Sequence, residues 1–160
     1  MWGKIINFAD DMRFLGNIEA KTDMKGRVFL PATFRKVLQQ ADEDILVLRR
    51  DVHEKCLVLY PLSVWNYRVD LLLAKANPFD DVAQMVVREF MSAATELTLD
   101  GNGRLLIPKN CLEEAEIKQT VRFIGMNDTI EIWAGEKASK PFLPQADFAA
   151  QLKLLMSDKG

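Results

Sequence analysis

A thirteen-residue segment occurs twice in this chain, and this internal repeat constrains the fold more than any other feature of the sequence. Residues 19–31 (EAKTDMKGRVFLP) align without a gap with residues 96–108 (ELTLDGNGRLLIP), 77 positions later. Five of the thirteen aligned pairs are identical, and three apolar residues separate the arginine from the proline in both copies. Such a repeat indicates that one supersecondary unit is built twice.

The same pattern of elements follows each copy. After the proline, which suits a first helical position because it lacks an N–H, apolar spacing predicts a short helix. The apolar positions are Phe34, Val37 and Leu38 in the first copy and Cys111, Leu112 and Ala115 in the second. Paired apolar stretches then predict a β-hairpin over residues 45–60 and another over residues 121–133. The repeating unit is therefore strand, turn, strand, short helix and hairpin.

Helical patterns fill the rest of the chain. Residues 62–74 and 79–93 have apolar side chains near the 3.6-residue period and are separated by Asn77-Pro78. A last helix over 145–156 carries an apolar face, and we expect the chain's own body to cover it, with a neighbouring subunit as the alternative. The expected organisation is an N-terminal extension (1–12), a first repeat (13–63), a helical insert (64–92), a second repeat (93–137), and a linker with a C-terminal amphipathic helix (138–160).

The motif shared by both copies is Asp-x-x-Gly-Arg between two predicted strands. The aspartate can accept backbone N–H groups of a turn, and the glycine can adopt the positive φ that tight turns need. A hairpin turn alone explains these two residues. It leaves the arginine of both copies unexplained, and an arginine fork pairs with guanine or with phosphate.

Two such hairpins on one body predict a β-ribbon that reads DNA. An aspartate in the same turn can hold the guanidinium through a charge-assisted bond. We expect Lys25 to add a phosphate contact in the first copy. The second copy has Asn102 at the matching position and should bind DNA more weakly. The predicted DNA-binding residues are Asp23, Lys25, Arg27, Asp100, Asn102 and Arg104, with Gly26 and Gly103 forming the turns.

These residues resemble a known family. Residues 23–35 are similar to the first repeat of the MraZ proteins and residues 100–108 to the second, and Leu59-Tyr60-Pro61, Trp65 and residues 130–133 fit the same pattern. The resemblance covers about residues 13–137. It implies a mainly β fold with helices, in which two tandem SpoVT/AbrB-like swapped-hairpin halves form one intertwined barrel, with a helical insert and a C-terminal helix.

The resemblance also implies a function. It suggests a bacterial transcriptional regulator, cytoplasmic and nucleoid-associated, that acts at the promoter of the division and cell-wall gene cluster. The DNA partner would be double-stranded, with short tandem repeats that contain a run of G, and the chain would assemble into a homo-oligomeric ring. Arg27, and by repetition Arg104, would contact the DNA, while Asp23 and Asp100 occupy the acidic position of the motif. Residues 1–11 precede the usual start of the family.

Composition limits the alternatives. A net charge of −2 disfavours a binder driven by a basic tail, although a local basic face remains compatible with it. Cys56 and Cys111 have no CxxC partner and are expected to be reduced, buried thiols. No apolar run reaches membrane length, and the acidic start is unlike a secretory signal. The sequence predicts no catalytic group, metal or cofactor.

A protein-interaction module is the second functional class that the sequence leaves open. In that interpretation the hairpins bind a protein, such as the methyltransferase encoded beside MraZ-type genes, or they act as a DNA-binding, antitoxin-like partner. An enzyme comes third, because no nucleophile–base pair or metal-ligand pattern is visible in the sequence.

Overall fold

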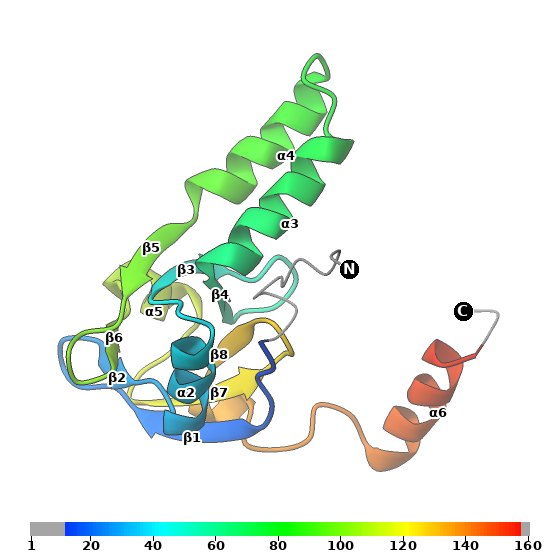
Figure 1. Ribbon diagram of the computed structural model, residues 1–160. Coiled ribbons are helices and arrows are strands. Elements are labelled where there is room, and N and C mark those ends of the chain that lie inside the picture. The colour runs from blue at the N-terminus through cyan, green and yellow to red at the C-terminus, as the bar shows by residue number, and fades with distance from the viewer. Residues whose placement is uncertain (1–11, 158–160) are drawn as a thin grey trace, which may run out of the picture.

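The computed structural model describes residues 12–157, so the predicted N-terminal extension lies outside the described residues except for Met12. Figure 1 shows a body of strands and short helices from which a long helical hairpin and a separate C-terminal helix project. The elements of the first repeat and the insert are β1 (Asn17–Lys21), β2 (Arg27–Phe29), α2 (Ala32–Gln40), β3 (Ile45–Arg50), β4 (Leu57–Pro61), α3 (Leu62–Lys75) and α4 (Asp81–Ser92). Those that follow are β5 (Thr95–Thr98), β6 (Arg104–Leu106), α5 (Lys109–Glu114), β7 (Thr120–Gly125), β8 (Ile130–Ala134), the 3-10 turn η1 (Gly135–Lys137) and α6 (Gln145–Leu155).

The two repeats exchange strands. A six-stranded antiparallel sheet has the order β1-β7-β8-β4-β3-β5, and β2 pairs with β6 in a separate two-stranded ribbon. The first repeat thus supplies β1 to the second repeat's hairpin β7–β8, while the second repeat supplies β5 to the first repeat's hairpin β3–β4. Since each hairpin is completed by a strand from the other repeat, the two halves are intertwined, as the family resemblance implied.

The exchange corrects the expectation of two self-contained Asp-x-x-Gly-Arg hairpins. The strands on either side of each turn do not pair with each other, because β1 bonds to β7, β5 bonds to β3, and β2 and β6 bond to one another. The mainly β class with helices is confirmed. Within residues 12–157 the hydrogen-bonded sheet is open, with β1 and β5 at its edges, and is not closed into a barrel.

The larger of two buried hydrophobic clusters contains residues of both repeats. α2 and α5 begin directly after Pro31 and Pro108, as predicted, and they bury Phe34 and Cys111 against the sheet. The fully buried side chains of greatest volume include Phe14, Phe34 and Phe123. The Phe14 and Phe34 rings meet edge to face with centroids 5.5 Å apart. Because both repeats contribute to this core, we expect the body to fold as one unit.

The insert forms an antiparallel pair of helices, α3 and α4, that projects from the body (Figure 1). At its base, the Trp65 ring stacks on the Phe90 ring with centroids 5.0 Å apart. Asp80 caps α4 by accepting the backbone N–H groups of Val82 and Ala83. The described helices include none that is both long and apolar enough to cross a membrane.

The C-terminal helix α6 lies away from the body in Figure 1, and all of its residues are exposed. Phe148 and Leu152, on the predicted apolar face, are 48% and 45% exposed. The linker before α6 contacts the body through the Phe142 ring, whose centroid is 5.1 Å from that of Trp133. The expectation that the chain's own body covers this face is therefore wrong. The linker before α6 places the helix away from the body, so the two do not pack together (Figure 1).

Candidate nucleic-acid interface

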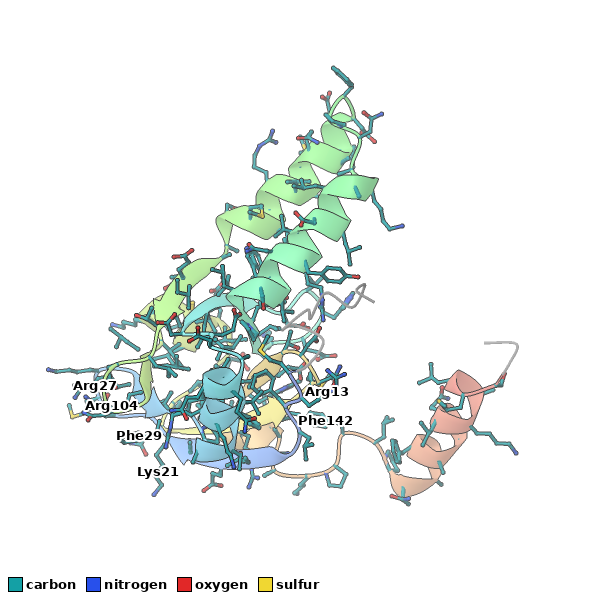
Figure 2. All side chains as sticks on the ribbon, viewed as in Figure 1. Arg13, Lys21, Arg27, Phe29, Arg104 and Phe142 are labelled. Carbon is teal, nitrogen blue, oxygen red and sulfur yellow. The ribbon has the colours of Figure 1, made fainter. Side chains whose placement is uncertain are left out.

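The β2–β6 ribbon brings the two predicted DNA-contacting arginines onto one face. Arg27 is paired with Leu106, and Arg104 with Phe29. Because side chains alternate along a strand, all four of these side chains share the outer face. The central pair, Val28 and Leu105, faces the core with 1% and 0% exposure. Figure 2 shows Arg27 and Arg104 together at one end of the body.

The first turn holds Arg27 through one aspartate. Oδ1 of Asp23 accepts the backbone N–H groups of Lys25 and Arg27, both at 2.9 Å, and Oδ2 accepts Nε–H of Arg27 at 2.7 Å. Gly26 has a φ of +85°, and its N–H donates to the carbonyl of Asp23 at 3.0 Å. The hydrogen bonds that the Asp23 carboxylate accepts, chiefly the one from the Arg27 backbone N–H, lower the pKa of Asp23.

The second turn reproduces this geometry. Oδ1 of Asp100 accepts the backbone N–H groups of Asn102 and Arg104, both at 2.9 Å, and Oδ2 accepts Nε–H of Arg104 at 2.8 Å. Gly103 has a φ of +84°. The pKa of Asp100 is lowered as well, with the Arg104 backbone N–H as the largest cause. The lysine of the first turn is replaced by Asn102, so the second turn carries less positive charge.

Each arginine is therefore oriented by its Nε–H and keeps the outer edge of its guanidinium for another partner. Among the described residues, neither Arg27 nor Arg104 uses its terminal nitrogens in an intramolecular hydrogen bond. The two arginine side chains differ in their exposure to an external partner. The side chain of Arg27 is 36% exposed and that of Arg104 is 25% exposed, and the Arg104 guanidinium carbon is 5.9 Å from the centre of the Phe29 ring.

The turns are braced by the opposite repeat. The N–H of Ile107 donates to the Gly26 carbonyl at 3.0 Å, and the N–H of Leu30 donates to the Gly103 carbonyl at 3.1 Å. A Cβ atom at Gly26 would come within 2.8 Å of the Ile107 carbonyl oxygen. Position 26 thus requires glycine both for its positive φ and for this close approach. Gly26 and Gly103, which the sequence assigned to the two turns, both have a positive φ.

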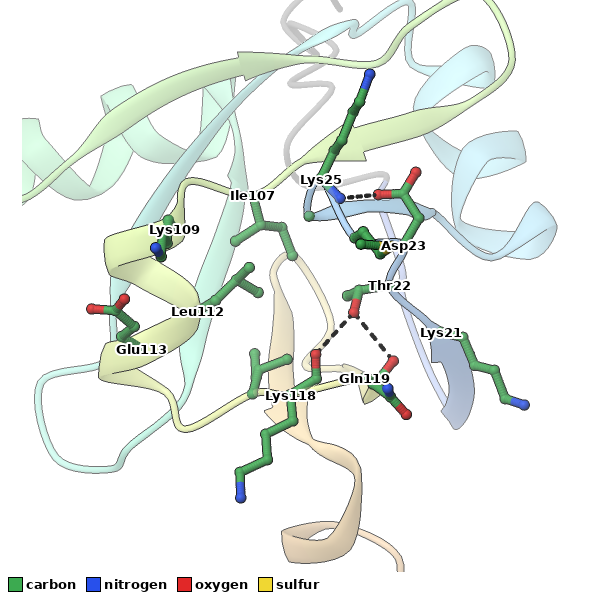
Figure 3. Close-up of a pocket in the computed structure, with 13 residues that line it drawn as sticks. Lys21, Thr22, Asp23, Lys25, Ile107, Lys109, Leu112, Glu113, Lys118 and Gln119 are labelled. Atoms are coloured by element: carbon green, nitrogen blue, oxygen red, sulfur yellow. Dashed lines mark hydrogen bonds between the residues drawn. The ribbon is translucent and has the colours of Figure 1, made fainter.

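The surroundings of the first turn add basic residues that the sequence did not single out. Figure 3 shows a pocket beside this turn that residues of both repeats line. Its lysines are Lys21, Lys25, Lys109 and Lys118. Only Lys25 was predicted, because Lys109 and Lys118 lie more than eighty positions away in sequence and reach the turn through the strand exchange. On the ribbon itself, the exposed Phe29 and Leu106 were also missed, since an apolar block between arginine and proline does not show which of its side chains face outward.

Potential metal ligands gather elsewhere in the described structure. The ligand atoms of Asp51, Cys56 and Glu131 all lie within 4.8 Å of one another. Burial is the main cause that raises the pKa of the Cys56 thiol, with the nearby carboxylates adding to it. The β3–β4 loop that carries Asp51 lies across the body from the two turns in Figure 1, so this cluster is not part of the ribbon.

Comparison with known proteins adds to this geometry. The family model described as "MraZ protein, putative antitoxin-like" matches residues 13–89 and 90–138. The chain belongs to the MraZ family. Similar MraZ proteins include one from Phocaeicola vulgatus, 56% identical over 145 residues that cover 91% of this chain and 94% of the relative. Another, from Bacteroides thetaiotaomicron, is 48% identical over 93% of this chain and 96% of its own length.

A more distant MraZ protein, from Actinobacillus pleuropneumoniae, is 33% identical over 75% of this chain and 78% of the relative. All three relatives carry the name transcriptional regulator MraZ. The two segments that match the MraZ family each contain one Asp-x-x-Gly-Arg turn. The resemblance identified from the repeated turns is therefore confirmed at the level of the family.

Proposed function

We propose that this chain is a transcriptional regulator that binds double-stranded DNA and reads short, G-containing direct repeats with the outer face of the β2–β6 ribbon. The observation that carries the proposal is the pair of arginines, Arg27 and Arg104, that share this face while an aspartate holds each Nε–H. A two-stranded ribbon fits the major groove. The names of the relatives agree with regulation of transcription.

The chemistry of the face suits guanine. An arginine whose Nε–H is fixed can direct its two terminal nitrogens at O6 and N7 of one guanine, a contact worth about 1–3 kcal/mol of discrimination. Phe29 and Leu106, 54% and 55% exposed, flank the arginines. Their apolar side chains can contact a thymine methyl group beside the guanine. The ribbon thus offers both kinds of contact that a sequence-selective reader needs.

Family membership supports the wider regulatory role that we propose. We place the action of this chain on nucleoid DNA in the cytoplasm, at the promoter of the division and cell-wall gene cluster. No catalytic step is part of the proposal. Arg27 and Arg104 are assigned to base contacts, and Asp23 and Asp100 position their guanidinium groups. Lys25 and Asn102 are assigned to the neighbouring phosphodiester backbone of the DNA.

Assembly of several copies, as a homo-oligomeric ring, forms part of the proposal. The outer side of α4 exposes Val82, Met85 and Val86 at between 53% and 69%, and α6 exposes Phe148 and Leu152. Apolar faces of this kind are commonly covered by a partner. Linked subunits would engage tandem repeats together, which multiplies weak contacts into useful affinity for an acidic protein.

The same apolar side of α4 supports a second candidate function, the docking of a different protein, such as a neighbouring methyltransferase. That function would use the projecting α3–α4 pair, whereas DNA reading uses the ribbon. The two candidates therefore predict that different residues are essential: Arg27 for DNA and the α4 face for a protein partner.

Fluorescence anisotropy with two duplexes tests the proposal. One duplex carries tandem G-containing repeats, and the other carries the same bases in scrambled order. We expect the parent protein to prefer the first duplex, and Arg27→Ala to reduce this preference by about 1–3 kcal/mol for each engaged subunit. Arg88→Ala, which removes an exposed arginine of α4, is the matched control. A folded parent protein that binds neither duplex contradicts the proposal.

A further inference from the structure

The two turns share their internal geometry but differ in their surroundings. Four lysines stand around the pocket beside the first turn: Lys21, Lys25, Lys109 and Lys118. Figure 3 shows the Lys21, Lys25 and Lys118 side chains directed outward from the rim of this pocket. Long cationic side chains that spread from a rim suit the separate phosphates of a nucleic-acid backbone better than a single small anion.

The second repeat contributes two of these lysines, Lys109 and Lys118, and specific bonds hold the segment of Lys118 against the first turn. Thr22, which precedes the turn, donates its N–H to the Gln119 carbonyl at 2.8 Å, and its hydroxyl lies 3.2 Å from the carbonyls of Lys118 and Gln119 (Figure 3). Lys21 is paired with Thr120 in the β1–β7 ladder. The segment that carries Lys118 is thus fixed to the base of the first turn, and Lys109 starts the neighbouring helix α5.

The corresponding places beside the second turn can be identified from the backbone. After α2 and after α5, one non-glycine residue has a positive φ, Asp42 at 54° and Glu116 at 58°. The backbone N–H of the following residue donates to a carbonyl of the preceding helix in both repeats. Glu43 donates to Leu38 and Ile117 donates to Leu112, each at 2.9 Å. Asp44 therefore occupies the place of Lys118. The 77-residue alignment puts Thr98, Asn102 and Ala32 at the places of Lys21, Lys25 and Lys109.

None of the four lysines has a basic counterpart at the second turn. The pocket beside the first turn is lined by four lysines and two carboxylates, a formal charge of +2. The hollow beside the second turn is lined by one arginine and three carboxylates, Glu43, Asp44 and Asp100, a formal charge of −2. The guanidinium of that one cation, Arg35, donates to the Leu30 carbonyl, and its side chain packs on Gly103.

We propose that Lys109 and Lys118 form a site for the phosphodiester backbone beside the first turn, and that the second turn has no such anchor. This inference rests on the proposed DNA binding and adds which residues hold the backbone and which turn they serve. Negative charge near the second turn repels phosphate, so DNA approaches the ribbon from the side of Arg27. The greater exposure of Arg27 compared with Arg104 favours the same side.

Salt dependence of DNA binding separates a backbone anchor from a base reader. The experiment compares the parent protein with the double variant Lys109→Gln/Lys118→Gln on the G-repeat and scrambled duplexes over a salt series. The slope of log Kobs against log salt is negative, and each phosphate contact contributes about −0.9 to it. Loss of two phosphate contacts should therefore make the slope less steep by about 1.8 per bound chain. We expect affinity for both duplexes to fall by a similar factor, with sequence preference retained.

The control is Lys75→Gln/Lys153→Gln, which removes the same total charge from exposed positions at the end of α3 and in α6. It should leave the salt slope as in the parent protein. If the parent binds DNA and the Lys109/Lys118 variant keeps the parent's slope and affinity, the inference is overturned while the proposed function stands. If the parent binds neither duplex, both fail.

A gain of binding provides a second test that does not depend on damaging the first turn. Asp44→Lys places a lysine at the counterpart of Lys118, on an exposed residue of the second repeat. We expect tighter binding to both duplexes at low salt and a steeper salt slope. An unchanged slope in this variant means that DNA does not pass the second turn closely enough to be repelled by it, which contradicts the proposal that negative charge at the second turn directs the DNA to the first.

Discussion

Arg104 lies diagonally across the β2–β6 ribbon from Arg27, on the same outer face, with Phe29 and Leu106 at the other two corners. Neither arginine reaches this arrangement through its own repeat, because each strand of the ribbon comes from a different repeat. The spacing of the two guanidinium groups is therefore set by the pairing of the repeats. A change that loosens that pairing would alter the outer face of the ribbon without changing either arginine.

Removal of the positioning carboxylate should separate specificity from charge. Asp23→Asn keeps Arg27 positive but weakens the hydrogen bond that fixes its Nε–H. We expect the preference for the G-repeat duplex to fall, while affinity for the scrambled duplex stays the same or rises slightly because a negative charge is lost. Fluorescence anisotropy on both duplexes measures this, with Asp70→Asn on the exposed side of α3 as the control. Retained preference in Asp23→Asn would show that the carboxylate does not orient the arginine.

Gly26→Val should destabilise the body as well as the turn. The new Cβ would lie 2.8 Å from the Ile107 carbonyl oxygen, on a residue whose φ is +85°. A backbone conformation of this kind costs a β-branched residue on the order of 1–3 kcal/mol, so the melting temperature should fall by several degrees. Gly101→Val is the control, because no atom lies within 4 Å of a Cβ there. Equal melting temperatures for the two variants would contradict the close approach at position 26.

Protonation of Asp23 and Asp100 at low pH should weaken the hydrogen bonds that hold both turns. The pKa values of Asp23 and Asp100 are lowered from 3.8, with the backbone N–H groups of Arg27 and Arg104 as the largest causes. A depressed pKa means that the carboxylate stabilises the fold above pH 3.8, and that this stabilisation is lost as pH falls through the lower, native pKa. Carbon-detected NMR titration should find both carboxyls titrating below 3.8. In Arg27→Ala the Asp23 value should move up towards 3.8 while that of Asp100 stays where it was.

Both thiols should be unreactive in the native protein. Cys56 and Cys111 are buried, and burial is the first cause that raises the pKa of each. The thiolate is the reactive form, so its population at pH 8 is very small. A chromogenic disulfide reagent should label neither cysteine until denaturant is added, and should then label two thiols per chain. Rapid labelling of the native protein would contradict the burial, and Cys56→Ser and Cys111→Ser would identify the reactive site.

The exposed face of α6 should affect the proposed assembly of several copies without affecting the fold of the body. Phe148→Asp/Leu152→Asp places charge on the apolar face, which no described part of the chain covers. We expect a smaller assembly by sedimentation velocity, with the melting temperature of the body unchanged. Gln151→Asp adds charge at a polar position of the same helix and serves as the control. An unchanged assembly in the double variant would mean that α6 takes no part in it.

The sequence predicted the helices and hairpins of the body, because local elements depend on local patterns, but it did not indicate the 3-10 turn η1. The helices after Pro31 and Pro108 and the hairpins that follow are present within a few residues of the expected bounds. The partner of each isolated strand could not be predicted from the residues alone. β1 and β5 suit any hairpin edge of matching apolar pattern, and only the family resemblance indicated an exchange.

The candidate site was predicted in part for the same reason. The turn chemistry is local, so Asp23, Gly26 and Arg27 could be assigned their roles in the turn from the sequence. The lysines of the second repeat could not, since nothing near Lys118 in the sequence points to a turn almost a hundred positions earlier. The cover of α6 was predicted wrongly, because an apolar helical pattern shows that a face needs a partner but does not show which one.

The strand exchange makes this chain resemble two subunits joined head to tail. A symmetric pair of identical subunits must present two identical turns, and any substitution that favours one turn alters the other equally. Covalent fusion removes that constraint: Lys118 and Asp44 occupy matching places with opposite charge. One molecule can thus give a direction to the proposed contact with a duplex, which a symmetric dimer of a single repeat could not do.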